Sequence, residues 1–394
     1  MTFDFMKSCM KRELGKETEL FMKNVRQANV NIHKDAWVEI NLESLAQNII
    51  EIKKGIPKDK KFLAIVKADA YGHGASMIAQ TMLASGVDAL GVSSVDEGLD
   101  LRAVKIKCPI LVVGAIPLWA IESAAQNDIA FSIFNQDHLK ACREVYERTG
   151  IRPKVHVKID TGMNRIGVRS EDGVEYINQV QKADYVNFEG VFTHLASAEE
   201  IEETQKQIDR WHSVIDNIDT EGLLLHIQNT AATFAYNIKS NMVRVGISLY
   251  GLYPDLPQKY NYKPVVKQVM GLKGRITNIH EVKAGEGVSY SHKFIAYEPT
   301  RVATIPIGYA DGVSRGLSNK IWGEINGQKI RQIGNITMDQ MMFDLGDTDA
   351  QVGDVITLLD DNDLSLDNWA EILGTINYEL TCRLKVRLPR IYVR

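Results

Sequence analysis

Short apolar runs alternate with longer amphipathic segments between residue 37 and about residue 250. Eight of the runs have the length and composition of buried strands, at 62–66, 89–92, 110–113, 129–134, 155–159, 188–192, 223–227 and 242–247. Helical spacing of apolar residues fills several of the intervals, as at 75–84 and 201–218. Eight alternating strand–helix units predict parallel strands closed into a (β/α)8 barrel of the TIM type. A doubly wound open sheet is the alternative, although no Gly-x-Gly-x-x-Gly follows any of these runs.

The pattern changes after residue 257. Glycine-rich turns separate short apolar runs at 265–270, 301–307, 330–333, 341–345 and 355–359, and helical spacing recurs only at 366–373. This pattern predicts a mainly antiparallel β domain. The expected organisation is therefore an N-terminal extension (1–36), a barrel (37–255) and a C-terminal β domain (256–394). The extension spaces some apolar residues as a helix would, so an additional helix, a loose extension and a start codon placed too early all stay open.

Composition excludes several classes of protein. A chain of 394 residues with a net charge of −4 has no large basic block, so nucleic-acid binding has little support. No apolar stretch approaches the ~20 residues that cross a bilayer, and the charged N-terminus does not resemble a signal peptide. The four cysteines lie far apart, without metal-ligand or disulfide spacing, which is typical of a reduced cytoplasmic protein.

Lys67 directly follows the first expected strand. A lysine at the end of a core strand can be desolvated, lose its proton near neutral pH and act as a free amine. The simpler alternative is a lysine whose side chain extends from the strand end to solvent.

Other polar residues follow later strands of the expected barrel, at the end where barrel enzymes carry their sites. His194 follows the sixth strand, Asn229 and Thr230 follow the seventh, and the eighth ends with glycine at 246. Gly246 would let backbone N–H groups approach a phosphate closely, and the Thr230 hydroxyl is another donor. Singly, His194 could be a core histidine and Thr230 a helix cap. Together they predict an anion site facing a lysine, which suits a phosphorylated aldehyde.

Residues 67–74 read KADAYGHG and resemble the cofactor-attachment motif of the alanine racemase family. The resemblance extends over roughly residues 37–392. It implies a barrel followed by a β domain, with pyridoxal 5'-phosphate bound to Lys67 as a Schiff base. It further implies a homodimer with shared active sites that supplies D-alanine for cell-wall peptidoglycan.

Racemisation needs a base on each face of the planar carbon, and the resemblance assigns these roles to Lys67 and Tyr290. Tyr290 lies in the segment GVSYS, which is similar to the family's catalytic loop that reaches the neighbouring subunit's site. By resemblance, Arg244 meets the cofactor ring nitrogen, where a permanently charged donor implies a weak electron sink. The resemblance also implies further cofactor-binding residues: Tyr71, Arg165, His194, Asn229, Thr230, Gly246, Ile247 and Tyr378.

A second strong match is the segment 158–167, KIDTGMNRIG. Arg165 is a credible carboxylate clamp on physical grounds, and the family uses it to contact cofactor and substrate. Lys158 carries a carbamate in some members, whereas an unmodified Lys158 paired with Asp160 is the alternative. Met338 is the implied substrate contact. Tyr309, Thr337 and Asp339 are the implied entrance residues, from the segments 306–312 and 335–340.

Three departures from the family pattern leave the substrate open. The N-terminal extension is long, Ser291 and His292 follow Tyr290 where alanine-specific members usually have glycine, and Thr337 stands where many have cysteine. We therefore expect an isomerase, an alanine racemase, with a broad-specificity racemase acting on serine or basic amino acids as the main alternative. A decarboxylase with a related architecture lacks its cysteine loop here, and a non-catalytic pyridoxal-phosphate carrier would lack the β domain.

Overall fold

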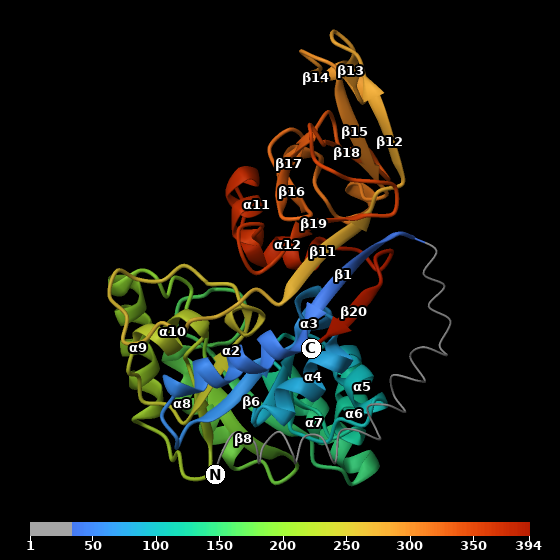
Figure 1. Ribbon diagram of the computed structural model, residues 1–394. Coiled ribbons are helices and arrows are strands. Elements are labelled where there is room, and N and C mark those ends of the chain that lie inside the picture. The colour runs from blue at the N-terminus through green and yellow to red at the C-terminus, as the bar shows by residue number, and fades with distance from the viewer. Residues whose placement is uncertain (1–33) are drawn as a thin grey trace, which may run out of the picture.

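The computed structural model describes residues 34–394, so the possible helix of the N-terminal extension lies outside the described residues. The described chain forms a helix-covered barrel with an elongated β-rich unit projecting from it (Figure 1). The barrel lies at the bottom of the view, and the hairpin β13–β14 forms the far tip of the projecting unit.

Parallel strands build the barrel wall in the order β10-β2-β3-β4-β5-β6-β8-β9. They are β2 (Lys61–Ile65), β3 (Ala89–Val92), β4 (Ile110–Val112), β5 (Ala130–Ile133), β6 (Lys154–Asp160), β8 (Asn187–Phe192), β9 (Leu224–His226) and β10 (Met242–Val245). The wall closes where Asn241 N–H donates to Leu225 O (3.1 Å) and Arg244 N–H donates to Gln228 O (3.0 Å). All eight expected strands are present, and the predicted fold class is confirmed.

Amphipathic helices cover the barrel because each buries one apolar face against the strands. They are α2 (Leu42–Lys54), α3 (Lys67–Gly72), α4 (Ala75–Ala84), α5 (Val95–Ala103), α6 (Ile121–Gln126), α7 (Gln136–Thr149), α8 (Ser170–Gln181), α9 (Ile201–Ile215) and α10 (Thr230–Ala235), with the 3-10 turns η1 (Leu118–Ala120) and η2 (Ile247–Tyr250) and the short strand β7 (Val168–Arg169). Side chains cap several N-termini: Asn41 accepts from Ser44 N–H, and Asn135 accepts from His138 N–H.

A second sheet forms the projecting unit, in the order β12-β15-β18-β17-β16-β19-β11-β1-β20. Its strands are β1 (Ala36–Asn41), β11 (Met270–Arg275), β12 (Asn278–Val282), β15 (Thr300–Ile305), β16 (Trp322–Ile325), β17 (Gln328–Ile333), β18 (Met341–Asp344), β19 (Val355–Leu359) and β20 (Arg390–Val393). The hairpin β13 (Gly287–Val288) and β14 (Phe294–Ile295), the turns η3 (Tyr290–His292), η4 (Tyr309–Asp311) and η5 (Arg315–Leu317), and the helices α11 (Leu366–Leu373) and α12 (Asn377–Arg383) complete the unit.

The sheet differs from the expected pattern in three respects. Strands β12, β16 and β20 have no counterpart among the expected runs. Residues 265–270 are not a strand, because the pairing begins only at Met270 and continues to Arg275 as β11. Strand β1 precedes the barrel in sequence but pairs antiparallel with β11 and parallel with β20, so it belongs to the second sheet. The expected strands near 301–307, 330–333, 341–345 and 355–359 and the helix 366–373 are present.

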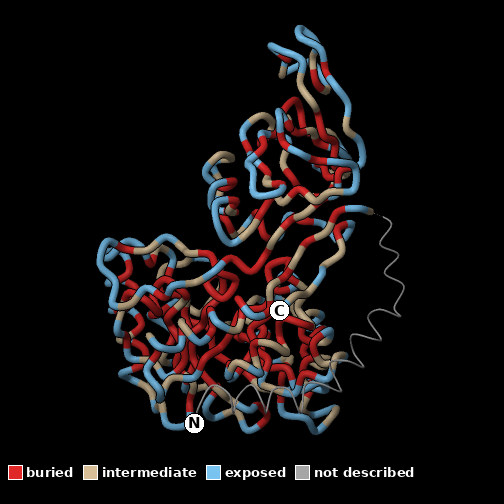
Figure 2. The backbone as a smooth tube through the Cα atoms, viewed as in Figure 1, coloured by how far each residue is buried: buried red, intermediate tan, exposed pale blue. Residues whose placement is uncertain are grey.

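The main core of buried side chains continues from the barrel into the second sheet, where the red segments of Figure 2 meet. Trp211 of α9, Phe131 of β5 and Phe343 of β18 are among its largest fully buried side chains. This continuity holds the second sheet against the barrel. A smaller cluster around Val288 and Val302 lies toward the tip of the projecting unit. None of the helices in residues 34–394 is long and apolar enough to span a membrane.

Candidate active site

A cavity of about 470 Å³ lies at the C-terminal ends of the barrel strands. Its lining includes ten residues expected from the sequence: Lys67, Tyr71, Lys158, Arg165, His194, Asn229, Thr230, Arg244, Gly246 and Tyr378. They come from segments scattered between β2 and α12, and only the parallel packing of the strands assembles them. Their individual roles stay predictions.

Lys67 is the first residue of α3, two positions after β2 ends. Its side chain is half-buried, and its amine has no polar partner within residues 34–394. Burial lowers the pKa of Lys67, and the Arg165 guanidinium lowers it further, whereas Glu97 and Cys382 act in the opposite direction. The lysine is therefore poised to release its proton more readily than a lysine on the surface.

The backbone after Lys67 adopts an uncommon conformation. Ala68, Asp69, Ala70 and Tyr71 have φ angles of 53°, 52°, 54° and 54°, so α3 contains a turn of left-handed helix. Left-handed helical geometry costs about 1–2 kcal/mol per non-glycine residue, because Cβ crowds the following carbonyl oxygen. Such strain persists only where the surroundings hold it, and it clusters at functional sites.

The opposite side of the cavity offers donors to an anion. Gly246 N–H donates to Thr230 Oγ1 at 2.9 Å, which leaves the Thr230 hydroxyl proton for another acceptor. A Cβ at Gly246 would lie 2.6 Å from the Tyr71 hydroxyl, so only glycine permits this approach. The hydroxyls of Tyr71 and Tyr378 have no hydrogen-bond partner in the described part of the chain. Their ring centroids lie 6.2 Å apart. Because neither hydroxyl is hydrogen-bonded within residues 34–394, both can donate to a ligand on this side.

Asn229 and Ile247, the sequence neighbours of Thr230 and Gly246, have structural roles. Asn229, rather than Thr230, caps α10: its side chain accepts from Ala232 N–H at 3.0 Å. The alternative in which Thr230 is merely the cap is therefore wrong. Ile247 is buried, begins η2 and does not line the cavity.

Arg244 is buried on β10 and held by acceptors on two neighbouring strand ends. It donates to the carbonyl oxygens of His226 (2.5 Å) and Thr193 (2.7 Å). It also contacts His194 Nδ1 and His226 Nδ1, both at 3.2 Å. Burial lowers the pKa of Arg244 to about 9, so the guanidinium is still charged at neutral pH. Its Nε–H has no acceptor among residues 34–394, which leaves one donor for a ligand.

His194 stays neutral in this cationic surrounding. Burial lowers the pKa of His194 well below its ordinary value, and Arg244, Lys158, Arg165 and Lys67 lower it further. Because Nδ1 accepts from Arg244, the proton lies on Nε2. His194 is therefore a neutral donor at the cavity wall.

Two basic residues, Lys158 and Arg165, lie on the β6 side of the cavity. Lys158 is 2% exposed, donates to Ile159 O at 2.9 Å, and burial lowers its pKa to about 7. Asp160 instead accepts from Gly162 N–H and Asn164 N–H and pairs with Arg169 at 3.1 Å. The alternative of a Lys158–Asp160 ion pair is therefore wrong for the described residues.

Tyr290 does not line the cavity of its own chain. It is 72% exposed and lies between β13 and β14, at the tip farthest from the barrel in Figure 1. Ser289, Ser291 and His292 around it have φ angles of 64°, 60° and 41°. A Cβ at Gly287 would lie 2.2 Å from the His292 ring, so the loop folds back on itself tightly. This strained, exposed loop is typical of a functional segment.

The expected entrance residues lie on the same projecting unit, outside the cavity. Tyr309 and Met338 are 42% and 53% exposed. Tyr309 N–H donates to Thr337 O, and Ala310 N–H donates to Met338 O, both at 3.0 Å. The loops that carry these side chains thus form one continuous surface.

Asp311, an acidic residue considered for binding basic substrates, is fully buried beneath this surface. It pairs with Lys34 and with Arg387 (3.5 Å), and it accepts from Gly308 N–H at 2.9 Å. Arg387 also pairs with Asp339 at 2.6 Å. Asp311 is therefore committed to holding the loops and is not available to a ligand.

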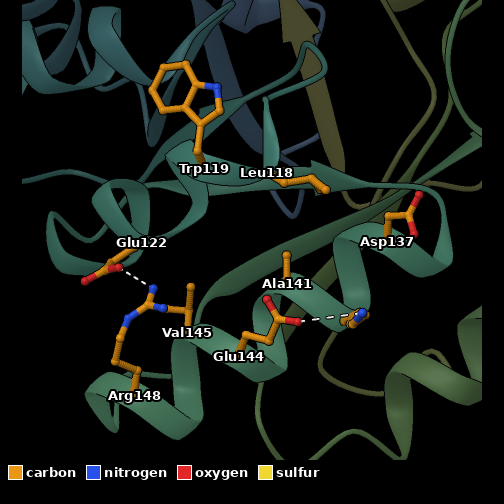
Figure 3. A pocket seen from close by; sticks show the side chains of 9 residues that line it. Leu118, Trp119, Glu122, Asp137, Ala141, Glu144, Val145 and Arg148 are labelled. Carbon is orange, nitrogen blue, oxygen red and sulfur yellow. Dashed lines mark hydrogen bonds and ion pairs between the residues drawn. The ribbon is translucent and has the colours of Figure 1, made fainter.

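A second cavity, of about 370 Å³, lies on the outer face of the barrel beside α6 and α7 (Figure 3). Leu118 and the 82% exposed Trp119 border it, Glu122 pairs with Arg148, and Glu144 pairs with a lysine. Because its cations are paired and no strand end faces it, this cavity is not the candidate active site.

Sequence reasoning missed Glu97, His226 and Cys382. Cys382 lines the cavity, His226 holds Arg244, and Glu97 contacts the turn after Lys67. The only signal available was their position near the ends of expected elements, because their partners are distant in sequence.

The fold and the cavity define a barrel enzyme with a reactive lysine and a cradle for an anionic ligand. The chain belongs to the alanine racemase family: residues 40–254 match its N-terminal domain and residues 269–392 match its C-terminal domain. The expectations of family and of an isomerase are confirmed.

Three relatives illustrate the match. The alanine racemase of Nostoc sp. is 40% identical over 91% of this chain and 96% of its own length. The structure of the Clostridium difficile 630 alanine racemase is 37% identical, has a TM-score of 0.86, and covers 92% of this chain and 96% of its own. A structure named histidine racemase, from Leuconostoc mesenteroides, is 28% identical with a TM-score of 0.84 and covers 92% and 99%.

Proposed function

We propose that this protein interconverts L-alanine and D-alanine with pyridoxal 5'-phosphate attached to Lys67. The observation that carries the proposal is the unpartnered amine of Lys67 in one cavity with unpartnered anion donors and the free Nε–H of Arg244. The residues fit this cofactor, because a lysine can take its aldehyde, the donors its phosphate and Arg244 its ring nitrogen. When bound, the cofactor withdraws electrons from the amino acid's Cα and so makes its proton acidic.

The chain's own residues hold and orient the reactants. Tyr71, Tyr378, Thr230 and the backbone around Gly246 and Ile247 would bind the phosphate. Asn229 would support Thr230 by fixing the start of α10. These groups are preorganised, so little reorganisation is needed when the anion arrives.

Arg244 would donate to the ring nitrogen without transferring a proton to it. Its remaining donors are already occupied by strand-end carbonyls and by two histidines, which fixes the guanidinium plane. A charged arginine keeps the ring nitrogen unprotonated, so electron withdrawal is moderate. That favours quick removal and return of a single proton.

Arg165 would bind the substrate carboxylate, since its guanidinium lines the cavity. A carbamate on Lys158 would hold Arg165 in place. Because the pKa of Lys158 is lowered to about 7, its neutral amine can form a bond to the carbon of CO₂ and lose a proton, which gives a carbamate anion. The anion would then pair with Arg165.

Two bases on opposite faces of Cα would perform the racemisation. Lys67, as a free amine, takes or returns the proton on one face. Tyr290 does so on the other face, and it must come from a second copy because it is exposed and outside its own chain's cavity. The proposal therefore includes a head-to-tail homodimer in which Tyr309, Met338, Thr337 and Asp339 of one copy border the entrance of the other.

Alanine is the proposed substrate because the curated relatives that this chain matches over nearly their whole length are named alanine racemase. A broader racemase stays the alternative, since a structure named histidine racemase shares the fold. The product D-alanine would serve cell-wall peptidoglycan. A cytoplasmic location and the domain boundaries at residues 36 and 255 stay predictions.

Chiral analysis tests the function directly. Purified protein reconstituted with pyridoxal 5'-phosphate is incubated separately with L-alanine, L-serine, L-lysine and L-histidine, and the D-enantiomer is measured over time. D-alanine formation that reaches a 1:1 mixture is expected. Absence of any D-amino acid from the loaded protein would contradict the proposal, and a faster reaction with another substrate would move it to the broader racemase.

A further inference from the structure

Glu97 connects the loop after β3 to the turn that follows Lys67. It lies in the first turn of α5, 29 residues away in sequence from the left-handed turn of α3. Its Oε1 accepts from Ala68 N–H at 2.7 Å, the first peptide after Lys67. Its Oε2 accepts from Ser93 N–H (2.7 Å) and from the Ser93 hydroxyl (2.9 Å).

Hydrogen bonds to Glu97 and to Asp69 fix the two ends of the left-handed turn. At its far end, Asp69 Oδ1 accepts from Ala75 N–H at 2.7 Å, and Asp69 O accepts from Gly74 N–H at 2.9 Å. At its near end, Glu97 provides the side-chain acceptor for Ala68. The backbone of Lys67 lies directly between β2, which is part of the rigid barrel wall, and this fixed peptide.

We propose that Glu97 is a positioning residue for Lys67: its carboxylate locks the Ala68 peptide onto the β3 loop and keeps a negative charge near the lysine amine. This inference rests on the proposed function of Lys67 as the catalytic amine and adds a residue to it. Glu97 does not line the cavity, so it acts on the reaction only through Lys67.

Glutamine cannot replace Glu97 at this place. Three donors converge on the two carboxylate oxygens, and an amide offers one oxygen and one NH₂ group. One donor would then face another, either at Ala68 or at Ser93. The substitution also removes the charge that raises the pKa of Lys67 against the lowering by burial and Arg165, with Cys382 the remaining group that raises it.

The test uses the full chain without cofactor. The pH dependence of Lys67 modification by reductive methylation is followed by peptide mass spectrometry, with amide exchange of residues 66–74 measured in parallel. Glu97→Gln should shift the midpoint of Lys67 modification to lower pH and speed exchange at Ala68 by roughly tenfold or more. Asp96→Asn is the matched control, because Asp96 is an exposed carboxylate on the same helical turn without a hydrogen bond in the described chain; it should change neither readout.

The loaded enzymes complete the test. Glu97→Gln should lower kcat by roughly tenfold or more with a smaller change in KM, because the lysine rather than the binding site is displaced. Unchanged Lys67 titration and Ala68 exchange in Glu97→Gln would overturn the inference, whatever the activity. A wild-type protein without racemase activity but with the expected shifts would instead refute the proposed function and leave the role of Glu97 intact.

A second variant decides the matter if Glu97→Gln does not fold. Glu97→Asp keeps the charge but shortens the side chain by one methylene, so it cannot reach both Ala68 and Ser93. Fast exchange at Ala68 with a nearly unchanged midpoint for Lys67 is expected. Slow exchange like the wild type would contradict the proposed lock.

Discussion

His226 Nε2 and His156 Nδ1 lie 2.9 Å apart inside the barrel, beneath the candidate active site. Arg244 donates toward His226 Nδ1, so His226 carries its proton on Nε2 and donates it to His156. Burial and the nearby Arg244 lower the pKa of His226 well below its ordinary value, so His226 stays neutral. His226, one of the acceptors around Arg244, is therefore held in place by its hydrogen bond to the buried His156.

Removing the acceptor in this pair should destabilise the protein. His156→Leu leaves the His226 Nε2–H buried without a partner, at a cost of about 1–3 kcal/mol in the free energy of unfolding. Urea unfolding monitored by fluorescence measures this loss. His156→Gln retains an acceptor and is the control; equal stability of the leucine variant and the wild type would contradict the proposed tautomers.

Lys67 should be the residue that holds the cofactor. Borohydride reduction of the loaded protein followed by peptide mapping should place the pyridoxyl group on Lys67, and Lys67→Ala should lower activity by at least about a thousandfold. Lys61, an exposed lysine on β2, provides a control variant, Lys61→Ala, with activity near that of the wild type. A pyridoxyl group on another lysine would refute the assignment.

Tyr290→Phe should nearly abolish racemisation while leaving cofactor binding intact, because one face of Cα loses its base. A loss of roughly a hundredfold to ten-thousandfold in kcat is expected, with the cofactor absorbance unchanged. Tyr297→Phe is the control, since Tyr297 is 96% exposed on the same unit. Wild-type turnover in Tyr290→Phe would make Tyr290 a structural residue.

Mixed dimers test whether Tyr290 acts across an interface. Lys67→Ala and Tyr290→Phe chains are each inactive, but a heterodimer would contain one complete site. Subunit exchange verified by native mass spectrometry should restore activity to the heterodimer fraction. Exchange without recovery would mean that each chain builds its own site.

Acid should destabilise the protein in a window set by His73. Burial lowers the pKa of His73 to about 4 from an ordinary 6.5. Between these values the unfolded chain binds more protons than the folded one, so stability rises with pH across the window and is lost as pH falls through it. His73 alone corresponds to roughly 3.5 kcal/mol, at about 1.4 kcal/mol per pKa unit.

Unfolding free energies at pH 4 to 7 check this window. His73→Asn retains a donor for the Ala70 and Tyr71 carbonyls that His73 Nδ1 contacts, yet cannot titrate, so it should flatten the pH dependence. The exposed His280 serves as the control through His280→Asn. An unchanged slope in His73→Asn would contradict the assignment.

Substrate preference should follow side-chain size and charge. Asp311 is paired with Lys34 and Arg387, so this carboxylate is not free to bind a basic side chain. We expect kcat/KM to be highest for L-alanine, lower for L-serine by up to about a hundredfold, and lower still for L-lysine and L-ornithine. A basic amino acid in first place would overturn the substrate and leave the racemase mechanism standing.

Periodicity predicted the barrel and the strand-end residues Lys67, His194, Asn229, Thr230 and Gly246, because the barrel strands are short, largely apolar runs whose ends must meet at one edge. Tyr71, Arg165 and Tyr378 came from the family resemblance. Strand β11 was placed too early, since its sequence MGLKGR contains two glycines and two cations. The polar strand β12 (NIHEV) and helix α12 gave no apolar pattern to read. Glu97 and His226 were missed because their significance arises only from contacts with residues on other strands or loops.

Strand β1 lies between β11 and β20, and Val38 pairs with Arg390 near the other end of the chain. During synthesis this strand leaves the ribosome first but must wait, with an unpaired edge, until the last strands of its sheet have been made. Contacts of such long range slow folding and expose an aggregation-prone edge in the interval. If the chain is divided after the barrel and the two fragments are co-expressed, they should therefore assemble only when β1 of the first fragment pairs with β11 and β20 of the second.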